Sequence, residues 1–175
     1  MKKFLIAIVS LIAASAISWQ LLGLYWKYEY GQKAPKVSLT VSEVSRHYYL
    51  FVPDNLTEPA PLVLAFHGGG GGGWRFPQQF LFEELAAAEG FIMAFPQAEH
   101  VEPNEGGWQL NSRADWMQDI NYVSVVIDDI GSGYSIDKLR VYGIGYSLGS
   151  MFIYELACHM TDRFAALASY AGTMP

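Results

Sequence analysis

The chain has 175 residues, of which 51% are hydrophobic and 15% aromatic, a composition that excludes a disordered protein and supplies one domain with a sizeable core. The net charge is −6 and Lys2-Lys3 is the one basic cluster, so a nucleic-acid partner is not expected. The single cysteine, Cys158, excludes an intramolecular disulfide and a cysteine-based metal site. Because it lies in an apolar helical pattern, Cys158 is expected to be buried.

Residues 1–30 predict export from the cytoplasm. Two lysines precede the apolar run at residues 4–17, which is the layout of a secretory signal, and residues 14–16 supply a small-x-small cleavage site. The apolar stretch continues to residue 26, however, and about 20 residues are enough to span a bilayer. A cleaved signal peptide and a signal anchor both stay open, with a buried core helix as the third alternative. The protein is expected to be secreted or periplasmic, or held at the membrane by this segment.

Two strands follow a polar linker. Residues 37–44 alternate between polar and apolar side chains and residues 46–52 are rich in Tyr, Phe and Val, so the two are predicted to form an antiparallel hairpin. Pro61 cannot donate a hydrogen bond to a strand ladder. The next strand is therefore expected at residues 62–66, whose continuous apolar run is typical of a strand buried on both faces.

His67 and the glycines at residues 68–73 follow this strand directly. Six successive glycines cost backbone entropy on folding, and a structural turn needs one or two. Without side chains, their N–H groups can closely approach a reacting oxyanion. A flexible linker is the alternative, and a phosphate-binding loop is a weaker one because the spacing of the known phosphate motifs is absent.

Helices and strands then alternate. Residues 77–89 predict a helix that stops at Gly90, and residues 91–95 predict a strand. The long polar loop that follows contains Trp108 and Trp116, which either contact a substrate or pin the loop to the body.

Asp119 is expected to cap a helix that runs to about Gly131. Asp128 and Asp129 oppose the dipole near the end of this helix, which hints at a tertiary partner. The pattern then predicts a strand at 139–144, a helix at 150–160 and a last strand at 164–170.

Residues 145–149, Gly-Tyr-Ser-Leu-Gly, connect that strand to that helix and are typical of a nucleophile elbow. Gly145 and Gly149 stand two residues before and after Ser147, where side chains would collide across the turn. The alternative is a glycine-rich turn whose serine only caps the helix. In an α/β sheet, ligands bind beyond the carboxyl ends of the strands, and the loop after His67 and Ser147 both lie at such ends. A serine beside an N–H-rich loop is the arrangement that acyl transfer needs.

Five stretches carry a family resemblance: LAFHG at 64–68, GF at 90–91 with PQ at 96–97, IDKLRVY at 136–142, the elbow, and DRFAA at 162–166 with AG at 171–172. Together they resemble the polyhydroxybutyrate depolymerase and feruloyl-esterase group of α/β-hydrolases, over residues 37–175. The resemblance implies an α/β-hydrolase-like fold, with a mainly parallel sheet, an N-terminal antiparallel hairpin and flanking helices.

The same resemblance implies a secreted serine esterase in which Ser147 attacks an ester carbonyl. The backbone N–H groups of Leu148 and Gly69 would form the oxyanion hole. The remaining glycines of the elbow and the first residues of the loop would support these groups; they are Gly145, Gly149, His67 and Gly68.

The sequence departs from the group in two respects. Members often carry Asn-Gly-Gly or Ala-Gly-Gly after the serine, whereas Leu-Gly-Ser follows Ser147, which leaves the substrate open. The group's acid and histidine follow the last strand predicted here, in the order Ser, Asp, His. After Ser147 this sequence has only His159, about 18 Å away along a helix and out of reach. His47 and His100 are expected to be ordinary surface residues, the first in an edge strand and the second in a loop.

We therefore expect residues 37–175 to form an incomplete hydrolase domain that lacks its C-terminal strands, acid and histidine. The predicted function is hydrolysis of carboxylic esters through an acyl-enzyme, with polyhydroxyalkanoate, feruloyl or short acyl esters as substrates, in a truncated chain. The alternative is a catalytically inactive, membrane-anchored fragment or binding module on the same fold. No metal or organic cofactor is implied, and the expected partners are an ester substrate and, through residues 1–30, a membrane.

Overall fold

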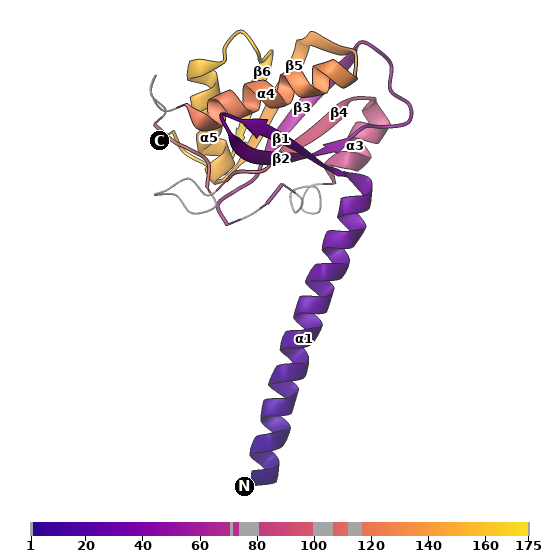
Figure 1. Cartoon of the computed structure of the whole chain (residues 1–175), viewed down its shortest axis with the longest axis vertical. Coiled ribbons are helices and arrows are strands. Elements are labelled where there is room, and N and C mark those ends of the chain that lie inside the picture. The colour runs from indigo at the N-terminus through magenta and orange to yellow at the C-terminus, as the bar shows by residue number, and fades with distance from the viewer. Residues whose placement is uncertain (1, 71, 74–80, 100–106, 112–116, 175) are drawn as a thin grey trace.

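A computed structural model describes residues 2–70, 72–73, 81–99, 107–111 and 117–174. A six-stranded sheet forms the centre of the domain, and one long helix projects from it (Figure 1). The described elements are α1 (Lys2–Lys33), β1 (Lys36–Val41), β2 (Val44–Phe51), β3 (Ala60–Phe66), α3 (Phe82–Glu89), β4 (Ile92–Pro96), α4 (Gln118–Gly133), β5 (Ile136–Tyr146), α5 (Leu148–His159) and β6 (Ala166–Tyr170).

The strand order is β1-β2-β4-β3-β5-β6. β1 pairs with β2 and β2 with β4 in antiparallel fashion, whereas β3, β4, β5 and β6 are parallel to one another. Ser42 and Glu43 close the β1–β2 hairpin with φ values of 48° and 68°, as a two-residue turn matched to strand twist requires. The predicted sheet with its N-terminal antiparallel hairpin is confirmed.

Pro61 lies inside β3, so the prediction that this strand begins at residue 62 was wrong. Ala60 already pairs with Ile136, and the register shifts between Ala60 and Leu62. A proline is tolerated at such an irregularity because no ladder hydrogen bond is required of its nitrogen.

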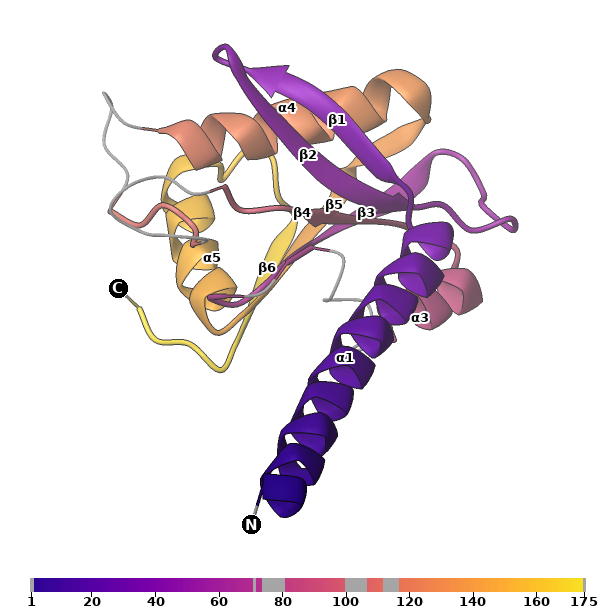
Figure 2. The same ribbon diagram turned by 60° about the horizontal axis from the view of Figure 1, so that its bottom comes forward.

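The helices lie on both faces of the sheet (Figure 2). Side chains of α4 and α5 pack with β3 residues such as Leu62 and Leu64 into the larger core, and α3 packs with Ala65 and Met93 on the opposite face. α3 ends as predicted at Gly90, whose φ of 72° suits glycine. The start predicted for this helix, at residues 77–80, lies outside the described residues.

Asp119 does not cap α4, and that prediction was wrong. Met117 occupies the N-cap position, and the Asp119 side chain is fully buried. One of its oxygens lies 2.7 Å from Nη2 of the buried Arg46, and the other accepts the Gln109 N–H at 2.7 Å. A buried carboxylate held by a guanidinium and an N–H ties the start of α4 to β2.

The two late acids of α4 do have tertiary partners, as their positions hinted. Asp128 binds Arg163 at 2.6 Å, and Asp129 accepts the Tyr48 hydroxyl at 2.6 Å. Cys158, by contrast, is exposed on α5, so its predicted burial was wrong.

α1 stands away from the domain (Figure 1). Residues Lys2–Trp26 form an apolar stretch long enough to cross a membrane, and none of its most apolar window is buried. The alternative of a buried core helix is therefore wrong. By length and composition, both a signal sequence and an anchor fit this helix.

Candidate active site

Ser147 occupies the turn between β5 and α5. Its φ of 53° and ψ of −115° lie in a region that residues with a side chain rarely adopt. The turn is held by the Ser147 N–H, which donates to the Tyr170 carbonyl at 2.9 Å, and by the Met151 N–H, which donates to the Ser147 carbonyl at 3.2 Å. The serine is partly exposed, at the carboxyl end of a central parallel strand.

The two glycines of the elbow have a steric cause. A Cβ on Gly145 would lie 2.2 Å from the Gly149 carbonyl oxygen, and a Cβ on Gly149 would lie 2.1 Å from the Phe66 carbonyl oxygen. Gly172, in the Ala-Gly pair of the family resemblance, is also constrained, because a Cβ there would lie 2.7 Å from the Ser147 carbonyl oxygen. The close approach of three backbone segments fixes where the serine stands.

The glycine loop after β3 reaches this serine. A Cβ on Gly68 would lie 3.1 Å from the Cβ of Ser147, and one on Gly69 would lie 3.6 Å from Leu148 Cδ2. Leu148 is the first residue of α5, so its N–H has no partner within the helix. The fold thus brings the two segments predicted to hold an oxyanion beside the serine.

The contacts of His67 hold this loop in place. Its side chain is 1% exposed. Nδ1 lies 2.8 Å from the Gly68 carbonyl oxygen and Nε2 lies 3.1 Å from the Ala98 nitrogen, so Nδ1 donates and Nε2 accepts. Burial lowers the pKa of His67 below its ordinary value and favours the neutral ring. With both ring nitrogens engaged, His67 is unavailable to take a proton from Ser147.

Gln97 also supports the loop, and the sequence analysis missed this role. Its Oε1 accepts the Gly73 N–H at 2.8 Å, and its Nε2 donates to the Ala98 carbonyl at 2.9 Å. The signals in the sequence were its place in the Pro-Gln pair of the family resemblance and its position directly after a buried strand.

Trp108 pins its loop to the body and does not line the substrate rim. It is fully buried, stacks on Phe152 at 4.8 Å between ring centroids, and donates from Nε1 to the His67 carbonyl at 2.8 Å. Trp116 lies outside the described residues.

The described histidines other than His67 lie elsewhere. His159 ends α5, with Nε2 at 3.8 Å from Glu155, and His47 lies on β2 at 3.7 Å from Glu99. Because β2 pairs on both sides, the expectation that His47 lies in an edge strand was wrong, while His100 lies outside the described residues. Over the described ranges there is no group of three or more His, Cys, Asp or Glu that could hold a metal ion.

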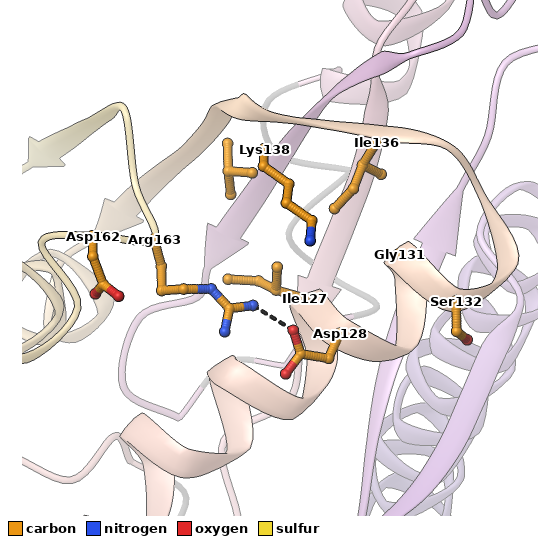
Figure 3. A pocket seen from close by; sticks show the side chains of 9 residues that line it. Ile127, Asp128, Gly131, Ser132, Ile136, Lys138, Asp162 and Arg163 are labelled. Atoms are coloured by element: carbon orange, nitrogen blue, oxygen red, sulfur yellow. Dashed lines mark hydrogen bonds and ion pairs between the residues drawn. The ribbon is translucent and has the colours of Figure 1, made fainter.

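A cavity of about 430 Å³ lies at the opposite end of β5, between α4 and the loop before β6 (Figure 3). Lys138 points into it beside the ion pair of Asp128 with Arg163. Val141, which also lines the cavity, is six positions before Ser147, about 20 Å along a strand, so this cavity lies away from the serine.

Solved structures that are similar in fold include esterases. An acetyl xylan esterase from Aspergillus awamori superposes with a TM-score of 0.69 at 24% identity, over 79% of this chain and 52% of its own. A ferulic acid esterase gives a TM-score of 0.63 at 17% identity, over 80% of this chain and 58% of its own. The chain has the α/β-hydrolase fold.

The sequence relatives of this hydrolase-fold chain are esterases too, although no protein-family model matches it. A bifunctional acetylxylan esterase/xylanase of Neocallimastix patriciarum is 30% identical over 127 residues, which is 73% of this chain and 18% of that protein. Feruloyl esterase B of Thermothelomyces thermophilus is 29% identical over 71% of this chain and 43% of its own.

The hydrolase-fold chain therefore spans less than half the length of the curated relatives named here. These relatives confirm the resemblance to the feruloyl-esterase group, which is a family of carboxylic ester hydrolases. The resemblance to polyhydroxybutyrate depolymerases stays a prediction.

Proposed function

We propose that the protein hydrolyses carboxylic esters through an acyl-enzyme, with Ser147 as the nucleophile. The Ser147 oxygen attacks the ester carbonyl, and its proton passes to a general base. The base returns this proton to the departing alcohol, and water then attacks the acyl-serine, which releases the carboxylic acid and restores the Ser147 hydroxyl. The observation that carries the proposal is the strained serine at the carboxyl end of β5, with a glycine loop packed directly against it.

The oxyanion that forms on attack would be held by the N–H groups of Gly69 and Leu148. Gly69 packs beside Leu148, and the N-terminus of α5 adds a partial positive charge where the negative charge develops. His67 and Gln97 keep the loop in place through hydrogen bonds that leave these two N–H groups out of the bracing network.

A general base is also required, and neither His67 nor His159 suits that role. Both ring nitrogens of His67 are held in hydrogen bonds, and His159 lies at the far end of α5 from Ser147. We propose that the histidine and the acid are supplied by sequence outside these 175 residues. The greater length of the esterase relatives supports this. Among substrates, the names of those relatives favour feruloyl or short acyl esters; polyhydroxyalkanoates remain a proposal from the motifs alone.

The same proposal places the domain outside the cytoplasm, with α1 retained as an anchor. Cleavage after Ala16 would leave a helix with Trp19 78% exposed, Leu21 60% exposed and Leu24 63% exposed in water. A contiguous apolar surface of this kind is stable in lipid and costly in water. Retention of α1 avoids that cost.

The test uses the protein as its gene encodes it, solubilised in detergent. Hydrolysis of p-nitrophenyl acetate is measured beside hydrolysis of a peptide amide, for the wild type, Ser147→Ala and the exposed-serine control Ser132→Ala. The proposal predicts ester hydrolysis that is lost in Ser147→Ala and retained in Ser132→Ala. Equal rates in all three proteins would remove Ser147 from the mechanism.

A non-catalytic protein on the same fold is the second candidate. It is favoured by one observation: the described histidines nearest in sequence to the elbow, His67 and His159, are engaged or distant. This candidate predicts a folded protein with no ester hydrolysis above the rate of Ser147→Ala.

A further inference from the structure

We propose that the edge of the sheet that carries Ser147 faces the bilayer in which α1 is anchored, so that the enzyme takes amphiphilic esters from the membrane surface. This inference rests on the proposed ester hydrolysis and on retention of α1. It adds an orientation and a substrate class to the proposed ester hydrolysis.

The first support is the surface of α1. Apolar side chains are exposed along its whole membrane-length stretch, from Phe4 at 74% to Trp26 at 40%. Two lysines stand at one end, and Tyr25 and Trp26 stand at the other, where aromatic side chains suit the level of the lipid headgroups. A bilayer is the partner that covers such a surface on all sides.

The second support is the junction between α1 and the sheet, which contains no flexible linker. α1 ends at Lys33 and β1 begins at Lys36. Between them Ala34 is 2% exposed, within the core cluster on the α3 face of the sheet, and the Pro35 carbonyl accepts the Leu50 N–H at 3.1 Å. Because proline also fixes its own backbone angle, the direction of the helix is tied to that of the sheet.

The third support is the side on which the elbow lies. In both views the end of α5 that follows β5 lies on the side of the domain from which α1 projects (Figures 1 and 2). Gly172, just after β6, packs on the carbonyl of Ser147, so the end of β6 lies at the same edge. The opposite edge, with Ser132 and the start of β5, faces away from the membrane.

The height of the domain above the membrane follows from the helix. Residues 27–33 continue α1 beyond the candidate span, a rise of about 10 Å. A serine edge that faces the bilayer across so short a stretch of helix would meet esters held in the outer surface of the bilayer. An insoluble polymer would have to fit between the domain and the lipid headgroups, so this orientation favours amphiphilic acyl esters.

Orientation is tested by energy transfer, which does not depend on catalysis. In a background from which Cys158 and any other native cysteine have been replaced by serine, the full chain carries a single donor-labelled cysteine through Thr173→Cys, at the serine edge, or through Ser132→Cys, at the opposite edge. Both proteins are reconstituted in phosphatidylcholine vesicles that contain a headgroup-labelled acceptor lipid. The proposal predicts a larger loss of donor emission at position 173 than at position 132.

A flexible Gly-Ser insertion after Lys33 is the matched control. It leaves the domain and α1 intact and frees their relative direction, so the difference between the two positions should shrink. Equal transfer from both positions without the insertion, or more transfer from position 132, would overturn the orientation while leaving ester hydrolysis untouched.

The substrate class is tested in the same vesicles with p-nitrophenyl palmitate and the soluble p-nitrophenyl acetate. The insertion should lower the palmitate rate relative to the acetate rate. An unchanged ratio would overturn the substrate class. Absence of hydrolysis of both esters would overturn the proposed function, and the energy-transfer result would still decide the orientation.

Discussion

Gly149, in the first turn of α5, packs directly on the backbone carbonyl of Phe66, the last residue of β3. This contact joins the segment that carries the serine to the segment that leads into the glycine loop. The nucleophile and the proposed oxyanion donors are therefore positioned by backbone packing, which tolerates no side chain between them.

Replacement of Gly149 by alanine is expected to destabilise the domain. The new Cβ would lie 2.1 Å from the Phe66 oxygen, and backbone atoms cannot move aside without shifting a strand or a helix. We expect a loss of roughly 1–3 kcal/mol in the free energy of unfolding. Urea denaturation measures it, with Gly133→Ala as the control, because nothing lies within 4 Å of a Cβ at Gly133. Similar unfolding midpoints for the two variants would contradict the packing.

Loss of the buried cation at Arg46 is expected to be more severe. Arg46→Met leaves the Asp119 carboxylate buried without its guanidinium, a change that costs about 3–5 kcal/mol. Arg163→Met breaks a pair whose carboxylate, on Asp128, is 67% exposed, and should cost at most about 1 kcal/mol. Thermal unfolding of both variants provides the comparison. A Tm for Arg46→Met as high as that of Arg163→Met would show that the buried pair is dispensable.

His67 is expected to make stability depend on pH. Burial lowers its pKa below the ordinary value of 6.5, so the unfolded chain binds a proton at a pH where the native ring stays neutral. The contribution of His67 to the free energy of unfolding is fully present above pH 6.5, and it is lost as the pH falls through the lower pKa of the native protein. His67→Gln should flatten this dependence, measured by urea unfolding at a series of pH values. The control is His159→Gln at the exposed end of α5, and equal flattening in both variants would rule out His67 as the cause.

Trp108 is expected to contribute to stability rather than to substrate contact. Trp108→Ala removes a ring stacked on Phe152 and a hydrogen bond to the His67 carbonyl, and should cost roughly 3–5 kcal/mol. Trp19→Ala, on the exposed surface of α1, should leave unfolding of the domain unchanged. Chemical denaturation followed by circular dichroism compares the two, and a stable Trp108→Ala protein would reopen the substrate-rim interpretation.

The order of strands and helices was predictable because the hydrophobic pattern changes period at each boundary, and Gly90 marks the end of α3. Pro61 and Asp119 were misplaced because local rules do not see the register of neighbouring strands or a distant cation. The register shift at Pro61 depends on the pairing of β3 with β5, and the burial of Asp119 depends on Arg46 in another element.

At the candidate site, the elbow could be predicted because its glycine spacing is dictated by a turn, and the glycine loop because its run of glycines exceeds what a turn needs. Gly172 and Gln97 belong to stretches that carry the resemblance, but their contacts could not be predicted, since each acts between segments far apart in the sequence. The burial of Trp108 was undecided for the same reason, because an aromatic residue in a loop has no local pattern that separates a core contact from a binding surface.

Covalent labelling of Ser147 is the most direct test of the account. The protein as its gene encodes it is treated with a fluorophosphonate, and the modified peptide is located by mass spectrometry in the wild type, Ser147→Ala and Ser132→Ala. An activated nucleophile predicts one adduct, on Ser147, that is absent from Ser147→Ala and undiminished in Ser132→Ala. An adduct of equal yield in Ser147→Ala, or a folded wild type that stays unlabelled, would contradict the assignment of Ser147 as the nucleophile of an ester hydrolase.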